Sequence, residues 1–204
     1  MIGIVSCGIG NVQSVLNAFA RLGHEAMAVE DPARLGEADR IVLPGVGAFP
    51  SCMRRLQESG FRAALDRDVK SGKPFLGVCV GMQLMAETGT EFGDMPGLGY
   101  IPGRVELIPK TSPDLRIPHI GWNDLRIARP TPLLAGLDTD SACYFVHSYA
   151  LRCAEEQDVA AWTDYGSPVV AAVARGNVFG LQAHPEKSQL VGLRILDNFA
   201  RLPC

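Results

Sequence analysis

Short apolar runs alternate with segments of helical hydrophobic spacing through the first 80 residues, and this alternation limits the possible folds more than any other feature. Strands are expected at four of the runs: Ile2–Val5, Ala26–Val29, Arg40–Leu43 and Pro74–Val78. Between them, apolar residues recur three and four positions apart, which predicts helices. These helices are expected at Val12–Leu22, with Asn11 as its N-cap, at Ser51–Glu58 and at Phe61–Lys70, with another beginning near Val80. Such alternation builds a parallel sheet with helices on its faces.

The second half of the chain is richer in strands than the first. Strand-like segments separated by turn residues are expected at Arg104–Ile108, Ile117–Ile127, Ala142–Leu151, Val159–Trp162, Val169–Ala174 and Val178–Gln182. Helical spacing returns only in the closing segment, from Leu190 to Phe199. Since no linker or repeat interrupts this order, we expect one domain over residues 1–204. The expected fold is α/β, with a mixed, mostly parallel central sheet flanked by helices.

Composition and charge exclude several classes of protein. The chain has 22 acidic and 19 basic residues in a mixed order, which argues against a nucleic-acid-binding protein. No apolar run approaches the roughly 18 residues needed to span a bilayer, and no export signal precedes the first strand. The six cysteines and four histidines are dispersed, without the spacing of a metal site. We therefore expect a cytoplasmic protein with no metal and no membrane partner.

The segment Gly77-Val78-Cys79-Val80-Gly81 follows an apolar run and precedes a helical pattern. This G-x-C-x-G order is typical of a nucleophile elbow, a sharp strand-to-helix turn that exposes its central side chain. Glycines are needed on both sides because a Cβ there would clash. A cysteine at a helix N-terminus is also stabilised as the thiolate by the helix dipole. Cys79 is therefore the candidate nucleophile, whereas the other five cysteines are expected to be structural.

A cysteine nucleophile that attacks an acyl group needs a base, and the base needs a group to orient it. His184 and Glu186 flank Pro185 directly after the strand-like run that ends at Gln182. In an extended segment the side chains of residues i and i+2 project to the same side. The two residues are thus the candidate base and orienting carboxylate. The order Cys, His, Glu differs from that of the α/β-hydrolases, which argues against a simple esterase.

An oxyanion formed during acyl transfer needs N–H donors directed at it. The amide of Val80 is one candidate donor, because it begins the helix after the nucleophile. A second donor is expected from the glycine-rich turn Pro44-Gly45-Val46-Gly47, whose lack of side-chain bulk would let backbone donors approach a ligand. A different motif, Gly8-Ile9-Gly10, begins like a dinucleotide fingerprint but has Gln13 in the place of the third glycine, so no nucleotide cofactor is expected.

Taken together, these motifs resemble those of the class I (triad) glutamine amidotransferases, whose fold is flavodoxin-like. The resemblance rests on Gly77–Gln83 and His184-Pro185-Glu186, and it narrows to the glutaminase subunits of imidazole glycerol phosphate synthase. The narrower match is carried by five further motifs: Gly8–Asn11 with Ser14-Val15, Leu43–Phe49, Pro118–Asn123, Tyr144–Tyr149 and His184–Gln189. Ser6-Cys7 departs from the family, which more often has an acidic residue and a tyrosine there.

The resemblance implies that Cys79 attacks the carboxamide of L-glutamine and that His184 and Glu186 complete the triad. It also implies that the Val80 amide and a reoriented amide of the turn, at Val46 beside Gly47, stabilise the oxyanion. It further implies that Gln83, Ser148 and Tyr149 help to bind glutamine, the last two through backbone groups. No cofactor is implied. Ammonia would pass to a (β/α)8-barrel cyclase subunit, which makes imidazole glycerol phosphate in histidine biosynthesis. A barrel needs about 250 residues, so the cyclase is expected to be a separate chain in a heterodimer.

Three residues are the expected contacts with this partner: Asn11, Trp122 and Lys187. Trp122 is chosen because tryptophan is enriched at binding hot spots. Glutaminase activity is expected to be low without the partner, since the Pro44–Gly47 turn needs reorienting. Three alternatives stay open at this point. They are a paralogue that feeds ammonia to another barrel synthase, a partner-independent cysteine hydrolase, and a catalytically silent interaction subunit.

Overall fold

A central sheet runs through the computed structural model, which describes residues 1–138 and 141–203. Cys204, the last of the six cysteines, lies outside the described residues, as do positions 139 and 140. Within the described residues the sheet has eight strands in the order β2-β1-β3-β4-β14-β13-β12-β9. The strands are β1 (Ile2–Val5), β2 (Ala26–Val29), β3 (Arg40–Gly45), β4 (Phe75–Cys79), β9 (Arg126–Ile127), β12 (Val159–Asp164), β13 (Pro168–Arg175) and β14 (Val178–Leu181).

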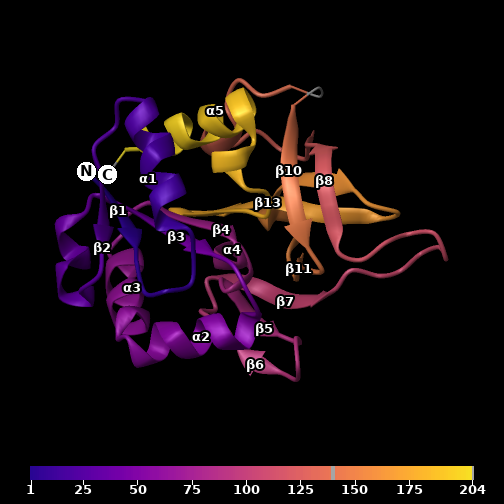
Figure 1. The fold of residues 1–204 in the computed structure, drawn as a ribbon, viewed down its shortest axis with the longest axis horizontal. Helices are drawn as coiled ribbons and strands as arrows, with labels where there is room; N and C mark the ends of the chain where they lie inside the picture. The colour runs from indigo at the N-terminus through magenta and orange to yellow at the C-terminus, as the bar shows by residue number, and fades with distance from the viewer. Residues whose placement is uncertain (139–140, 204) are drawn as a thin grey trace.

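The first five strands in this spatial order are parallel, and the last three pair antiparallel. Four long helices cover the parallel part, as their hydrophobic spacing predicts. In Figure 1, α1 (Val12–Arg21) and α5 (Gln189–Ala200) lie over one face, while α2 (Phe49–Glu58) and α3 (Phe61–Lys70) lie over the other. Asn11 caps α1 as predicted, since its Oδ1 accepts a hydrogen bond from the Ser14 amide. The expected mixed, mostly parallel sheet is confirmed.

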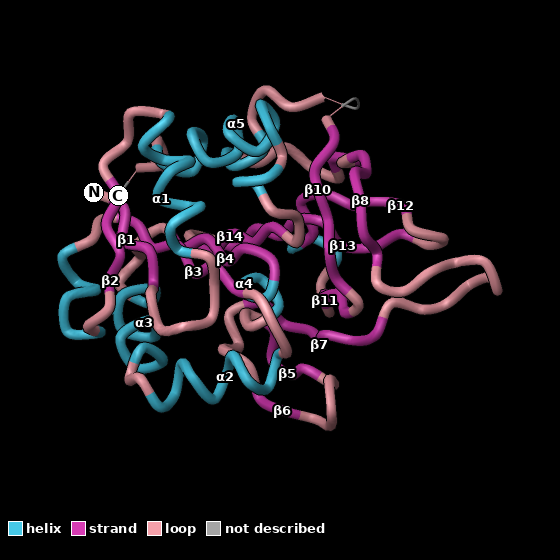
Figure 2. The backbone as a smooth tube through the Cα atoms, viewed as in Figure 1, coloured by secondary structure: helices cyan, strands magenta, loops and turns pink. Residues whose placement is uncertain are grey.

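Two smaller sheets stand beside the antiparallel end of the central sheet. One contains β5 (Ala86–Gly89), β6 (Met95–Pro96), β7 (Ile101–Leu107) and β11 (Tyr149–Cys153), and the other pairs β8 (His119–Asp124) with β10 (Ala142–His147). Figure 2 shows that a long loop joins β7 to β8 and extends away from the body of the protein. Among the described residues, no helix combines the length and the apolar character that a membrane crossing requires.

The structure corrects three predictions about the elements. The expected strand Ala142–Leu151 is two strands, β10 and β11, which belong to different sheets and separate at Ser148. The expected strand Ile117–Ile127 likewise divides into β8 and β9. The helix after Cys79, α4 (Val80–Gln83), has only four residues, and the chain then enters β5. The sequences of these two segments carry no signal for a change of partner strand, because each half is strand-like by itself.

Candidate active site

The carboxyl ends of β3, β4 and β14 meet at one edge of the central sheet, and the candidate residues gather there. Gly45 at the end of β3 lies directly beside Cys79 at the end of β4. On the other side of β4, Leu181 of β14 lies beside Val78, and the chain then continues to Gln182 and His184. Ligands of parallel α/β sheets bind at this edge because the strand ends leave a crevice there.

Cys79 occupies the sharp turn that the sequence predicts. Its backbone has φ 53° and ψ −114°, a conformation that residues with a Cβ rarely adopt. A Cβ at Gly81 would lie 1.9 Å from the Leu43 carbonyl oxygen, and one at Gly77 would lie 2.5 Å from that of Gly81. The glycine requirement is therefore confirmed. The dipole argument is weakened, however, because a helix of four residues sums few peptide dipoles.

His184 and Glu186 are in direct contact, as expected. The His184 Nδ1 atom lies 2.8 Å from Glu186 Oε1, and both side chains are at least 95% buried. The backbone reason differs from the prediction, because only His184 is extended, while Pro185–Lys187 form a single 3-10 turn. Glu186 Oε2 is buried and finds no hydrogen-bond partner in the described part of the chain. The His184 ring is thus the hydrogen-bonded counter-charge of this carboxylate.

Two opposing effects set the protonation of His184. Burial lowers the pKa of its imidazole, but hydrogen bonds and charge interactions with Cys79 and Glu186 outweigh burial and raise the pKa to about 9. A ring with this pKa is protonated at neutral pH and carries a proton for a leaving group. The same interactions bring the sulfur, the imidazole and the carboxylate together in one unit, as predicted.

Cys79 and His184 open into a cavity of about 320 Å³. Ligand pockets of proteins begin near this volume. The six remaining predicted oxyanion and substrate-binding residues line it as well: Val46, Gly47, Val80, Gln83, Ser148 and Tyr149. Glu91, Pro118, Val146 and His147 line it as well. Glu91 is the acidic side chain among the lining residues, and it was not singled out from the sequence because it lies in the connection between β5 and β6.

The predicted oxyanion donors differ in their availability. Val80 is the first residue of α4, where a backbone N–H has no acceptor within the helix. The Val46 N–H instead donates to the Ile9 carbonyl oxygen at 2.6 Å. On the neighbouring peptide, the Val46 carbonyl oxygen accepts a hydrogen bond from the Cys52 thiol at 3.5 Å. The Val46 amide is therefore engaged away from the cavity, and Gly47 next to it has φ +110°.

The segment of Ser148 and Tyr149 is held against the triad through β10. The His184 amide donates to the Tyr144 carbonyl oxygen at 2.9 Å, and the Tyr144 amide donates to Ser188 Oγ at 2.9 Å. The Tyr149 carbonyl oxygen accepts from Gln83 Nε2 at 2.8 Å and from His147 Nδ1 at 2.9 Å. Gln83 is buried and its amide nitrogen also lies 3.1 Å from Gln182 Oε1.

Besides Glu91, three residues of the site were not singled out from the sequence: His119, His147 and Gln182. His147 contacts His119, with 3.1 Å between His147 Nε2 and His119 Nδ1, and Gln182 Nε2 lies 3.8 Å from Cys79 Sγ. The available signals were the position of His147 next to Ser148 and that of Gln182 two residues before His184. Neither signal specifies a contact, because the partners come from other strands.

The three predicted interface residues are exposed but lie in two places. Trp122 is 51% exposed on β8, where its cross-strand partner is Tyr144, and Ile120 and Val146 form the next exposed pair. Asn11 and Lys187 lie at a small cavity of about 20 Å³ that Val46, His184 and Glu186 also line. The second group thus lies at a cavity that His184 and Glu186 also line.

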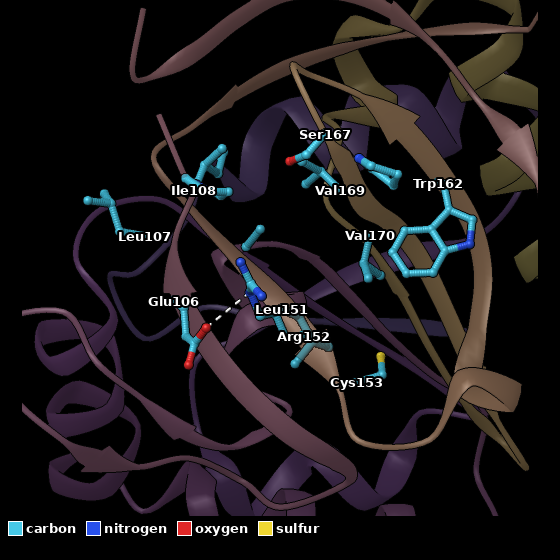
Figure 3. A pocket seen from close by; sticks show the side chains of 13 residues that line it. Glu106, Leu107, Ile108, Leu151, Arg152, Cys153, Trp162, Ser167, Val169 and Val170 are labelled. Atoms are coloured by element: carbon cyan, nitrogen blue, oxygen red, sulfur yellow. Dashed lines mark ion pairs between the residues drawn. The ribbon is translucent and has the colours of Figure 1, made fainter. Parts of the chain in front are cut away.

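A separate cavity of about 490 Å³ lies between β7, β11, β12 and β13. Figure 3 shows Trp162 and Cys153 at one end and the Glu106–Arg152 ion pair, 3.0 Å long, at the other. None of the predicted catalytic residues lines it. Within the described residues, no group of three or more His, Cys, Asp or Glu side chains is arranged to hold a metal ion.

Comparison with known proteins gives a consistent result. Residues 4–201 match the family described as glutamine amidotransferase class-I. Imidazole glycerol phosphate synthase subunit HisH of Syntrophotalea carbinolica is 48% identical over 203 residues, which cover 98% of each chain. The protein of the same name from Wolinella succinogenes is 46% identical over 204 residues, covering 99% of this chain and 100% of that protein.

Solved structures support the fold at lower sequence identity. A crystal structure of a glutamine amidotransferase superposes with a TM-score of 0.75 at 22% identity, covering 97% of this chain and 96% of the other. The structure of PurLQS from Thermotoga maritima gives the same TM-score at 20% identity with the same coverage. The predicted α/β fold is thereby confirmed.

Proposed function

We propose that this chain, which belongs to the class I glutamine amidotransferase family and to its HisH branch, hydrolyses L-glutamine and delivers the ammonia to a synthase partner. The proposal rests on the arrangement of Cys79, His184 and Glu186 at the carboxyl edge of the central sheet. His184 is bonded to Glu186 at 2.8 Å and interacts with Cys79, and both Cys79 and His184 open into one cavity.

Catalysis begins with attack of the Cys79 sulfur on the carboxamide carbon of glutamine, which forms a tetrahedral oxyanion. As the C–N bond breaks, protonated His184 gives its proton to the leaving ammonia, and a γ-glutamyl thioester is left on Cys79. The neutral ring then takes a proton from water, whose oxygen attacks the thioester and releases glutamate. Glu186 orients the ring and stabilises its charged form throughout.

Substrate recognition follows from the lining of the cavity. Glu91 is placed to pair with the α-ammonium group of glutamine, because a carboxylate favours a cation in a partly buried site. Two donors already occupy the Tyr149 carbonyl oxygen. The predicted backbone contacts of Ser148 and Tyr149 to substrate are therefore assigned to their N–H groups, which suit the substrate carboxylate.

The Val46 peptide is the proposed control point. Its N–H is bonded to Ile9 and would have to turn toward the cavity to join Val80 as an oxyanion donor. Loss of one such donor typically costs about 10²–10³ in kcat. We expect the isolated chain to be a weak glutaminase and the partner to promote the reorientation. Equal steady-state rates with and without the ligand-bound partner would remove this argument.

The proposed partner is a separate cyclase subunit of imidazole glycerol phosphate synthase. Ile120, Trp122 and Val146 present an apolar surface on β8 and β10 beside the cavity, and Val46 at the cavity is 50% exposed. Exposed apolar groups next to a site mark a contact surface. Asn11 and Lys187 are the other proposed contacts, at the small cavity that Glu186 also lines.

A test of the function uses the chain together with its cyclase. Replacing Cys79 by Ala is expected to abolish glutamine-dependent synthesis, because no nucleophile remains, and to leave ammonia-dependent synthesis intact. Loss of both activities would show that Cys79 serves the fold or the interface instead. Growth of a histidine auxotroph that lacks its own subunit distinguishes this function from a paralogue that feeds another synthase. A partner-independent cysteine hydrolase would be fully active alone.

A further inference from the structure

Cys79 directly precedes α4, a helix so short that its dipole contributes little to stabilising a thiolate. The four residues of α4 supply little of the field that a helix of several turns develops. Hydrogen-bond donors close to the sulfur therefore carry more of the stabilisation. Besides His184, the structure provides one such donor from a side chain to which the mechanism above gives no role.

That donor is Gln182, which is completely buried directly after β14. Its Nε2 atom lies 3.8 Å from Cys79 Sγ, and its Oε1 atom lies 3.1 Å from Gln83 Nε2. A glutamine amide has one end that donates and one that accepts. The contact stabilises a thiolate only if the nitrogen end faces the sulfur, so the orientation of this amide decides its effect.

The Tyr149 carbonyl oxygen fixes that orientation. Because a carbonyl oxygen only accepts hydrogen bonds, the Gln83 atom that contacts it at 2.8 Å must be the amide nitrogen. The same Gln83 nitrogen faces Gln182 and requires an acceptor there, so Gln182 must present Oε1 to Gln83. The Gln182 nitrogen is then left to face Cys79. The donor and the acceptor of each hydrogen bond between Tyr149 and Cys79 are thus fixed by one carbonyl group.

A second branch ends on the same carbonyl oxygen and holds it in place. His147 Nδ1 donates to it, so His147 Nε2 is the acceptor for His119 Nδ1 at 3.1 Å. The remaining His119 nitrogen, Nε2, accepts from Asn123 Nδ2, which lies 3.3 Å away. Burial lowers the pKa of His119 and of His147 to about 4, in agreement with one proton on each ring. His119 is also stacked between Phe145 and Tyr165.

We propose that Gln182 donates from Nε2 to the Cys79 sulfur and stabilises its thiolate, with Gln83 and the Tyr149 carbonyl holding the amide in that orientation. The inference rests on the proposed function, since it assigns Cys79 as the nucleophile. Gln182 would then be a further catalytic residue, because it touches a reacting atom, whereas Gln83, His147 and His119 are positioning residues for it. A donor to the sulfur favours the charged form and lowers the pH at which the thiol ionises.

Two substitutions separate the donor from the shape of the side chain. Gln182→Glu keeps an acceptor for Gln83 but directs a carboxylate oxygen at the sulfur, and Gln182→Met removes both polar ends at similar length. The readout is the pH dependence of Cys79 alkylation by iodoacetamide, resolved by peptide mass spectrometry. We expect both variants to raise the midpoint by about one pH unit or more, since a hydrogen bond to a charged group is worth about that much. The Glu variant should show the larger shift.

Controls for this experiment come from the same chain. Thr163 is also completely buried and its Oγ1 has no hydrogen-bond partner among the described residues, so Thr163→Val tests the effect of removing a buried polar group elsewhere. Its Cys79 midpoint should equal that of the wild type. The alkylation profiles of Cys7 and Cys153 provide internal references in every sample, and both should be unchanged.

An unchanged Cys79 midpoint in folded Gln182→Glu and Gln182→Met would overturn the proposal. Should both variants fail to fold, the wild type still gives an answer through the ¹H–¹⁵N signals of the Gln182 side-chain amide. These signals should shift with pH at the alkylation midpoint of Cys79 and lose that shift in Cys79→Ala; signals that do not respond would overturn the proposal. A wild-type complex without glutaminase activity would instead contradict the proposed function, whatever the midpoints.

Discussion

Two histidines line the same cavity but differ in charge at neutral pH: His184 is protonated, whereas His147 is neutral. His184 is bonded to the Glu186 carboxylate and has a pKa raised to about 9, whereas His147, which lines the same cavity, has a pKa lowered to about 4. Both side chains are buried. The difference therefore comes from their partners, because the hydrogen-bond partners of His147 are a carbonyl oxygen and a second neutral histidine.

The comparison shows how one residue type serves two purposes in the lining of a single cavity. Burial alone removes the charge from an imidazole, which makes it a fixed donor and acceptor. At His184, interactions with Cys79 and with the buried Glu186 carboxylate reverse that outcome and make the ring an acid. The charged histidine is suited to proton transfer and the neutral pair to holding a backbone carbonyl in place.

Removing the carboxylate charge should have the largest effect, because it makes His184 resemble the neutral pair. Glu186→Gln preserves the size of the side chain, but the pKa of His184 should fall, and less of the ring would carry a proton at neutral pH. We expect kcat for glutamine hydrolysis in the complex to fall by about 10⁴-fold, a loss typical of triads whose carboxylate is replaced by an amide. Stopped-time glutamate assays measure it. A loss below about tenfold would mean that Glu186 is not the orienting group.

The two environments should also oppose each other in the pH dependence of stability. His119 and His147 have folded pKa values of about 4, below the unfolded value near 6.5, so the unfolded chain binds more protons between these limits and stability falls as the pH falls. Each of these two histidines should lower the free energy of unfolding by about 2 kcal/mol between pH 7 and pH 5. His184 has the opposite sign: its contribution is fully present below about pH 6.5 and is lost as the pH rises through about 9.

Urea unfolding of the chain across this range measures both windows. His147→Asn should reduce the pH dependence of the unfolding free energy below about pH 6.5 by the contribution of one histidine. The loss of stability at alkaline pH should stay unchanged. A pH dependence in the acidic range identical to that of the wild type would show that His147 is not held neutral in the folded chain.

A smaller effect is expected from the support that His147 gives to the substrate-binding backbone. His147→Leu removes the Nδ1 donor to the Tyr149 carbonyl oxygen, while Asn places its amide nitrogen near the position of Nδ1. The Leu variant should raise KM for glutamine about tenfold, the equivalent of one hydrogen bond, with a smaller change in kcat. The Asn variant should recover part of the loss. Equal KM values for both variants would show that the donor has no part in substrate binding.

Much of the site was predictable because its signals are local. The G-x-C-x-G turn needs glycines where a Cβ would meet backbone oxygens, and the structure has those contacts at Gly77 and Gly81. The pairing of His184 with Glu186 was also predictable, since only Pro185 separates them. The length of α4 was not, because Leu84 and Met85 continue a helical pattern although the chain turns into β5 instead.

By itself, the sequence determined the parallel part of the sheet, the strained turn at Cys79 and the set of chemical groups available for acyl transfer. Each of these depends on neighbours within a few positions along the chain. Only the tertiary structure decided that Val46 turns its N–H to Ile9 and that Gln182, Gln83 and Tyr149 form one chain of hydrogen bonds. Those contacts join strands up to about a hundred residues apart, and a hydrogen bond has a direction only once its partners are in place.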